Sequence, residues 1–135
     1  MKEEALNGKP YYIRIMKQNG LFFLDILSIV PPKGTRCFIQ APGIEGLSSV
    51  LSKTDDPAIM VMDCNKSTIE VIKNKIIYSN IQDNFMYISI KNNDITLFEG
   101  YDGVEFGVFS KNIIIPQWFR NKYKPNGWYE ISDDW

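Results

Sequence analysis

Clustered carboxylates are the side chains of this sequence with the most evident potential for catalysis. Asp102 and Glu105 flank the dipeptide Gly103-Val104, and Glu99 precedes them in the same segment. Carboxylates at such spacing can serve as general acid and base in glycoside hydrolysis, or can bind a divalent cation. The pattern also describes an ordinary Asp-Gly hairpin turn with charges facing solvent, because turn residues recur for backbone reasons. We favour the turn, and keep as an alternative a small carboxylate-dependent enzyme that uses Glu99 and Glu105 in a cleft.

Histidine is absent from the sequence. Its absence excludes the Ser-His-Asp and Cys-His nucleophile systems and histidine-ligated zinc. Cys37 and Cys64 are the only cysteines, and their spacing forms neither a CxxC motif nor a disulfide framework. A helix start just after Cys64 would lower the pKa of its thiol. Without a histidine base, we interpret both cysteines as reduced, partly buried thiols of a cytosolic protein.

Signals for bound metals and phosphates are weak. Asp55, Asp56 and Asp63 lack the spacing of a calcium-binding DxDxDG loop. The glycines of residues 43–46 form no GxGxxG pattern, and no P-loop lysine follows them. We therefore expect no metal and no cofactor.

The C-terminal segment, residues 128–135, combines three aromatic and three acidic side chains in eight residues. Rigid aromatic anchors and steering charges are typical of protein interfaces. The alternative is a terminal strand that buries Trp128 or Tyr129 and frays after it. With the carboxylates of the 99–105 segment, the candidate partner-binding residues are Glu99, Asp102, Glu105, Trp128, Glu130, Asp133, Asp134 and Trp135.

A second mixed segment joins basic and aromatic residues. Trp118, Arg120 and Lys122 could stack on and neutralise single-stranded nucleic acid. At helical spacing, Trp118, Phe119 and Tyr123 instead predict a core stripe with the lysines reaching outward. The net charge of -1 also argues against bulk binding to phosphates, so we expect no nucleic-acid partner.

Length and composition predict one soluble, folded domain covering residues 1–135. The chain has 135 residues, of which 44% are hydrophobic and 23% charged. Its strongest apolar run, residues 21–30, is far shorter than the roughly 20 residues that cross a bilayer. The acidic start lacks the basic and apolar regions of a signal peptide. We expect a cytoplasmic protein without a membrane partner, as a monomer or homodimer.

Alternating apolar and polar residues predict strands in the N-terminal half. Gln18-Asn19-Gly20 predicts a hairpin turn between the first two strands, since Asn and Gly accept positive φ. The predicted strands span residues 11–16, 21–30, 36–40 and 58–62. A short helix is expected around residues 47–51.

A longer helix is predicted over residues 67–78. Ser67 and Glu70 fit a capping box, and Ile69, Ile72 and Ile76 follow at helical spacing. A strand over residues 68–77 is the alternative, because β-branched residues lower helix propensity.

The C-terminal half predicts a three-strand meander. Its strands span residues 84–91, 95–101 and 104–110, joined by turns at residues 92–94 and at Asp102-Gly103. A helix then begins at Pro116 and ends before residues 125–127, and residues 128–131 are extended. The fold class is α+β, mainly an antiparallel sheet with two or three helices packed on it.

The C-terminal third resembles the immunity proteins of bacterial contact-dependent inhibition and related polymorphic-toxin systems. The resemblance covers roughly residues 84–135 and rests on the segments 99–107 (EGYDGVEFG), 115–119 (IPQWF) and 128–135 (WYEISDDW). It implies a small cytosolic protein without catalytic activity that binds a cognate toxin domain, often a nuclease, and blocks its active site. A nuclease surface is usually basic, so the candidate carboxylates would face it.

Overall fold

A seven-stranded sheet forms the centre of the structure, a computed structural model that describes residues 16–42, 47 and 49–135. The strand order is β2-β3-β1-β4-β5-β6-β7, and every neighbouring pair is antiparallel except the parallel pair β6–β7. The strands are β1 (Thr35–Gln40), β2 (Ser52–Lys53), β3 (Ile59–Asp63), β4 (Tyr87–Asn92), β5 (Ile95–Tyr101), β6 (Phe106–Phe109) and β7 (Tyr129–Ile131). The α+β class expected from the sequence is confirmed.

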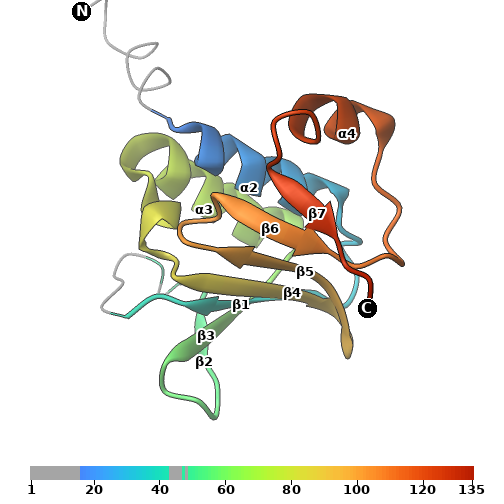
Figure 1. Ribbon diagram of the computed structural model, residues 1–135. Coiled ribbons are helices and arrows are strands. Elements are labelled where there is room, and N and C mark those ends of the chain that lie inside the picture. Colours follow the sequence, from blue (N-terminus) through green and yellow to red (C-terminus); the bar gives the residue numbers. More distant parts are fainter. Residues whose placement is uncertain (1–15, 43–46, 48) are drawn as a thin grey trace, which may run out of the picture.

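The α-helices of the described residues pack on one side of this sheet (Figure 1). They are α2 (Gln18–Ile29), α3 (Lys66–Ser79) and α4 (Gln117–Tyr123), and a 3-10 turn, η1 (Ile81–Asn84), follows α3. Phe22 packs helix α2 against both the sheet and helix α4. The centroid of its ring lies 6.2 Å from that of Phe98 in β5 and 4.8 Å from that of Tyr123 in α4. Burial of such rings is the main contribution to the core.

The segment of residues 18–30 is a helix, so the predicted hairpin turn and second strand are wrong. Phe22, Phe23, Ile26 and Leu27 are buried at helical spacing. The run is apolar on nearly every side, and a buried helix of this kind cannot be told from a buried strand by periodicity. Gly20 permits close helix packing instead of a turn, since a Cβ there would lie 2.7 Å from Ile76 Cγ2 of α3.

The predicted helix over residues 67–78 is confirmed as α3, but its cap differs from the prediction. Asn65 is the N-cap, and its side chain accepts a hydrogen bond from the Thr68 amide while the Thr68 side chain accepts from the Asn65 amide. The helix begins before Ser67, so the capping box is formed two residues earlier than Ser67 and Glu70 suggested. Ile72 and Ile76 are buried as the helical stripe predicts.

Most of the remaining elements agree with the sequence. Strands β1, β3, β5 and β7, the turn at residues 92–94 and helix α4 lie where they are predicted, whereas the predicted turn at Asp102-Gly103 extends over residues 102–105, so β6 begins at Phe106 instead of residue 104. Strand β4 begins at Tyr87 instead of residue 84, because η1 precedes it. Residues 49–50 form a turn and no helix is assigned there, since Leu47 closes only one turn with Val50 and Leu51. Residues 11–15 of the first predicted strand lie outside the described residues.

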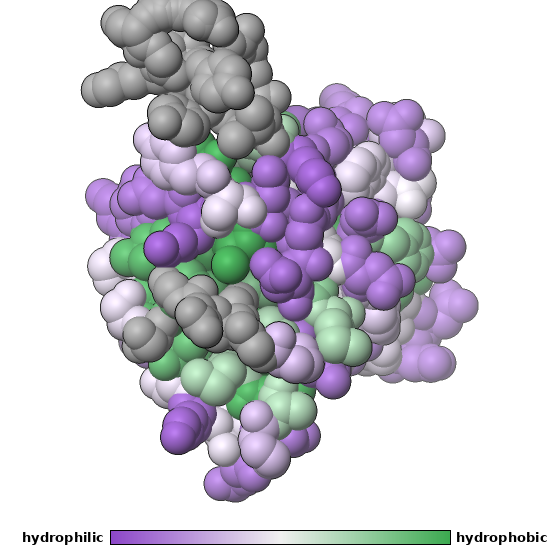
Figure 2. Space-filling view, turned by 90° about the vertical axis from the view of Figure 1, so that its left-hand side faces the viewer, coloured by the Kyte–Doolittle hydropathy of each residue, from purple (hydrophilic) through white to green (hydrophobic). Residues whose placement is uncertain are grey.

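Apolar side chains also reach the surface. On the flank shown in Figure 2, hydrophilic side chains cover the upper and right-hand parts, and apolar ones gather nearer the centre and the lower part. Large exposed apolar side chains include Ile114, at 88% exposure, and Trp118, at 47%. In the part of the chain that the structure describes, no helix is long and apolar enough to cross a membrane.

Candidate functional site on one face of the sheet

One face of the sheet carries no helix of the described residues. Cys37, Ile39, Ile88, Ile90 and Phe98 are fully buried on the helical side. Side chains alternate along a strand, so their neighbours point to the opposite side, which we call the open face. On the central and C-terminal strands the open face carries Arg36, Phe38, Gln40, Tyr87, Ser89, Lys91, Glu99, Tyr101, Phe106, Val108 and Glu130.

The strand register places these side chains in rows. Phe38 pairs with Ser89, Ser89 with Glu99, Glu99 with Val108, and Val108 with Glu130. Glu99 and Glu130 therefore lie in one row, separated by two strand spacings, or about 10 Å. A second row contains Tyr87, Tyr101 and Phe106.

Glu99 accepts hydrogen bonds from two tyrosines of the open face. The Tyr87 hydroxyl donates to Glu99 Oε2 at 2.8 Å, and the Tyr101 hydroxyl donates to Glu99 Oε1 at 3.1 Å. Tyr87 and Tyr101 are cross-strand partners with ring centroids 5.6 Å apart. We call this group the Tyr–Glu–Tyr cluster; its hydrogen bonds hold three side chains of the open face in one arrangement.

Burial and the neighbouring carboxylate keep both phenols protonated. Burial, with the hydrogen bond and negative charge of Glu99, raises the pKa of Tyr87 to about 12. The same causes raise the pKa of Tyr101. Both hydroxyls are therefore hydrogen-bond donors at neutral pH, and each Glu99 oxygen already has one donor. The cluster is suited to receive a cationic or donor group in the remaining acceptor positions.

A buried hydroxyl adjoins the Tyr–Glu–Tyr cluster. Ser89 is 5% exposed, and its Oγ has no hydrogen-bond partner among the described residues. Ser89 lowers the pKa of Tyr87, an effect that ranks below those of burial and Glu99. Because its Oγ is buried, this hydroxyl belongs to the packing beside the cluster and is not exposed to a partner.

Two cations border the cluster on the β1 side. The guanidinium of Arg36 lies 5.3 Å from the centroid of the Phe38 ring, and Lys91 Nζ lies 5.5 Å from it. Arg36 and Lys91 are cross-strand partners. The open face is therefore cationic over β1 and β4 and anionic over β5 and β7.

The candidate residues from the sequence do not form one patch. Glu99 and Glu130 share the open face. Asp102 and Glu105 belong to the β5–β6 turn, whereas Asp133 and Asp134 follow β7, whose parallel pairing with β6 places them at the opposite end of the sheet.

The two tryptophans have structural contacts of their own. Trp128 packs against the core, with its ring centroid 5.1 Å from Phe22. The Trp135 carbonyl accepts a 2.8 Å hydrogen bond from the Lys111 amide, which holds the end of the segment.

Glu99 and Glu105, the two carboxylates of the alternative enzyme, have different neighbours in the structure. Glu99 lies on the open face with both oxygens bonded to tyrosines. Glu105 lies towards the start of α2, where it makes a contribution, smaller than that of Asp83, to the raised pKa of Lys17.

Phe38, Tyr87, Ser89 and Tyr101 are site residues that the sequence reasoning did not select. The alternation of Tyr87 and Ser89 with isoleucines was visible in the sequence. It did not show that the helices of the described residues lie on the other side of the sheet from the tyrosines, which depends on the whole sheet.

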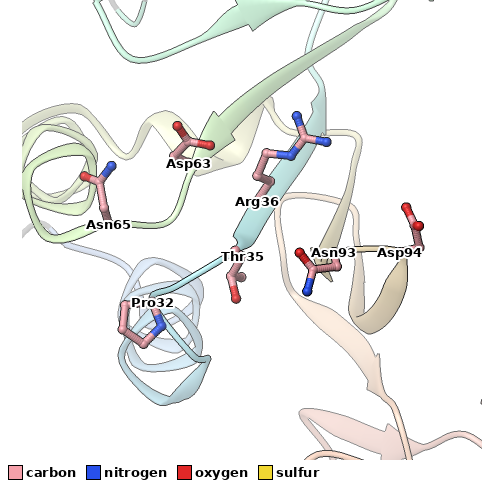
Figure 3. A pocket seen from close by; sticks show the side chains of 8 residues that line it. Pro32, Thr35, Arg36, Asp63, Asn65, Asn93 and Asp94 are labelled. Atoms are coloured by element: carbon pink, nitrogen blue, oxygen red, sulfur yellow. The ribbon is translucent and has the colours of Figure 1, made fainter.

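A polar depression lies beside the open face at the start of β1. It has a volume of about 620 Å³ and is lined by Pro32, Gly34, Thr35, Arg36, Asp63, Asn65, Asn93 and Asp94. Arg36 and Asp63 come from paired strands, and Asn93 and Asp94 from the β4–β5 turn (Figure 3). Among the described residues, no three His, Cys, Asp or Glu side chains gather as a metal site would require.

Comparison with protein-family models, curated proteins and solved structures finds no match to this chain. Its function is therefore inferred from its own geometry and chemistry.

Proposed function

We propose that this protein is a small cytoplasmic immunity protein that binds a cognate bacterial toxin domain through the open face of its sheet. The observation that carries this proposal is the Tyr–Glu–Tyr cluster, three pre-ordered side chains on a sheet face that no helix of the described residues covers. A toxin that acts on nucleic acid has a basic surface, which the carboxylates of the open face would contact.

The residue types of the open face favour protein binding. Tyrosine and arginine are enriched among the residues that dominate interface energetics. Here Tyr87 and Tyr101 are already restrained by Glu99 and by each other, and Arg36 adjoins Phe38. Side chains ordered before binding lose less conformational entropy on association.

The charges of the face favour a partner with a basic surface. Over β5, β6 and β7 its charged side chains are Glu99 and Glu130, which lie in one row. A nuclease active site is positively charged because it holds phosphate. Carboxylates presented by an inhibitor increase the association rate and orient the complex.

The proposal is tested with the toxin domain encoded beside the gene for this protein, by measuring complex formation and protection of cells. We expect Glu99→Ala and Tyr87→Ala each to weaken binding at least tenfold, or about 1.4 kcal/mol. Asp133→Ala with Asp134→Ala, at the far end of the sheet, and Glu70→Ala on the exposed side of α3 are the matched controls.

Circular dichroism of every variant separates loss of contact from loss of folding. Open-face variants that stay folded and protect cells as well as the wild type would overturn the proposed surface. A neighbouring domain that neither binds this protein nor harms cells would overturn the immunity function.

A further inference from the structure

A groove on the helical side of β7 is lined by cationic and apolar side chains, whereas the open face over β5 and β7 carries carboxylates. It lies between the β6–α4 connection, α4 and β7, and its volume is about 270 Å³. Ile113, Ile115 and Ile131 provide an aliphatic lining, and Ile131 is 40% exposed. The volume is below the range of about 300–1,000 Å³ typical of drug-sized ligands, which suits one or two side chains.

Three cations surround this aliphatic lining, which has no carboxylate in it. Arg120 and Lys124 are one helical turn apart at the end of α4, and Lys111 approaches from the β6–α4 connection. The ion pairs found among the described residues are Lys17–Asp83 and Lys122–Asp25, so none of the three groove cations takes part in one.

Among the described residues, the partners of the groove cations are neutral groups. Arg120 Nη2 donates to Gln117 Oε1 at 2.7 Å, and Lys111 Nζ donates to the Asp133 carbonyl at 3.4 Å. Lys124 Nζ lies 5.1 Å from the centroid of the Tyr129 ring. Their positive charge therefore remains available to an anionic partner.

We propose that this groove binds an acidic peptide segment that carries one large apolar side chain. The apolar side chain would occupy the space between the isoleucines, and flanking carboxylates would contact Lys111, Arg120 and Lys124. Apolar anchoring inside a ring of charges is a recurrent arrangement for peptide recognition. The groove is separate from the open face, so it would bind a segment other than the surface that meets the Tyr–Glu–Tyr cluster.

A peptide fits this groove better than single-stranded nucleic acid does. Nucleic-acid bases need exposed aromatic faces for stacking. Tyr129, the aromatic residue of the groove lining, is only 2% exposed, and the exposed Trp118 is not part of that lining. Lys122 forms an ion pair with Asp25 at 2.9 Å and does not line the groove. Arg120 and Lys122, the basic residues of the nucleic-acid alternative, therefore do not act together at this site.

The experiment measures fluorescence polarisation of a labelled synthetic peptide with glutamates around a central phenylalanine, titrated with the full chain. We expect saturable binding that weakens as salt is added, because exposed charges are screened. We expect at least tenfold weaker binding when the phenylalanine is replaced by serine, and when Arg120→Glu is combined with Lys124→Glu.

The matched control combines Lys73→Glu with Lys75→Glu on exposed positions of α3, which changes the net charge equally. Lys111→Glu, outside α4, tests the groove independently if the α4 variant fails to fold. Glu99→Ala should bind the peptide as the wild type does, which separates this site from the open face.

Absence of peptide binding would overturn the proposal. So would equal loss of affinity in the α3 control, or unchanged affinity in folded groove variants. An oligothymidylate that binds more tightly than the peptide and displaces it would assign the groove to nucleic acid instead.

Discussion

Tyr87 and Glu99 lie on neighbouring strands, and the Tyr87 hydroxyl donates a 2.8 Å hydrogen bond to the Glu99 carboxylate on the open face. The second carboxylate oxygen accepts from Tyr101 at 3.1 Å. One acidic residue therefore orients two aromatic rings on the open face. This relationship gives a rigid surface feature whose chemistry can be measured before any partner is known.

The ionisation of Tyr87 should respond to Glu99. In the wild type, burial and Glu99 raise the pKa of Tyr87 to about 12. Glu99→Gln removes the negative charge while keeping an acceptor, so we expect the Tyr87 pKa to fall towards its ordinary value. NMR titration of labelled tyrosine rings measures the shift. Glu130→Gln, in the same row but two strands away, should leave the Tyr87 pKa unchanged. An unchanged pKa in Glu99→Gln would contradict the role of the carboxylate.

Folding stability should decline in alkaline solution. Burial, with a smaller effect of Asp63, raises the pKa of Cys64 from 9.0 to about 12, and burial also raises that of Tyr123. Above pH 9 the unfolded chain releases protons that the native chain retains, so the free energy of unfolding falls with rising pH up to about 12. Urea denaturation across this interval measures the effect. Tyr123→Phe should reduce the slope, whereas stability that rises with pH would contradict the assignment.

The N-cap of α3 should be Asn65 and not Ser67. Asn65→Ala removes the acceptor of the Thr68 amide, and we expect a loss of about 1 kcal/mol in the free energy of unfolding. Ser67→Ala removes only an exposed hydroxyl that donates to Asn65 Oδ1 at 2.8 Å, so its effect should be smaller. Denaturant unfolding of both variants provides the comparison. A larger loss from Ser67→Ala would instead support the capping box predicted from the sequence.

Gly107 should be required for ring packing in the sheet. A Cβ at this position would lie 2.1 Å from Phe98 Cζ, so the buried Phe98 ring would have to move. We expect Gly107→Ala to destabilise the fold by about 1–3 kcal/mol, as overpacking of a core does. Thermal or urea unfolding measures this loss, and adding Phe98→Leu should recover part of it.

Gly127→Ala is the comparison for this effect. Its Cβ would meet nothing within 4 Å, although φ is +73°. Any cost at Gly127 is therefore due to backbone conformation, and we expect it to be smaller than at Gly107. Equal losses at the two glycines would argue against the ring overlap.

Residue patterns along the chain correctly predicted the β4–β5–β6 meander and α3. The β4–β5–β6 meander follows from alternating residues and from turn residues that accept positive φ, as Asn93 and Asp102 do. The helical spacing of Ile69, Ile72 and Ile76 predicted α3, and Ile72 and Ile76 are buried in the structure. In contrast, residues 21–30 are apolar on nearly every side, so they contain no local signal that separates a buried helix from a buried strand.

The candidate site was predictable only in part. Glu99 and Glu130 were selected for their charge, and both lie on the open face. The tyrosines that bind Glu99 were read only as members of an alternating pattern, because their common side is defined by the pairing of β4 with β5. Likewise, the separation of Asp102 and Glu105 from Asp133 and Asp134 results from the parallel pairing of β7 with β6.

The sequence by itself determined the α+β class, the meander, α3 and the absence of histidine chemistry, because these depend on composition and on neighbours along the chain. Only the tertiary structure decided that residues 18–29 form a helix, that the helices of the described residues all lie on one side of the sheet, and that Arg120 and Lys124 share a groove with Ile131. Such relationships depend on contacts between segments distant in sequence. Their free energy comes from burial and pairing that no single segment can provide.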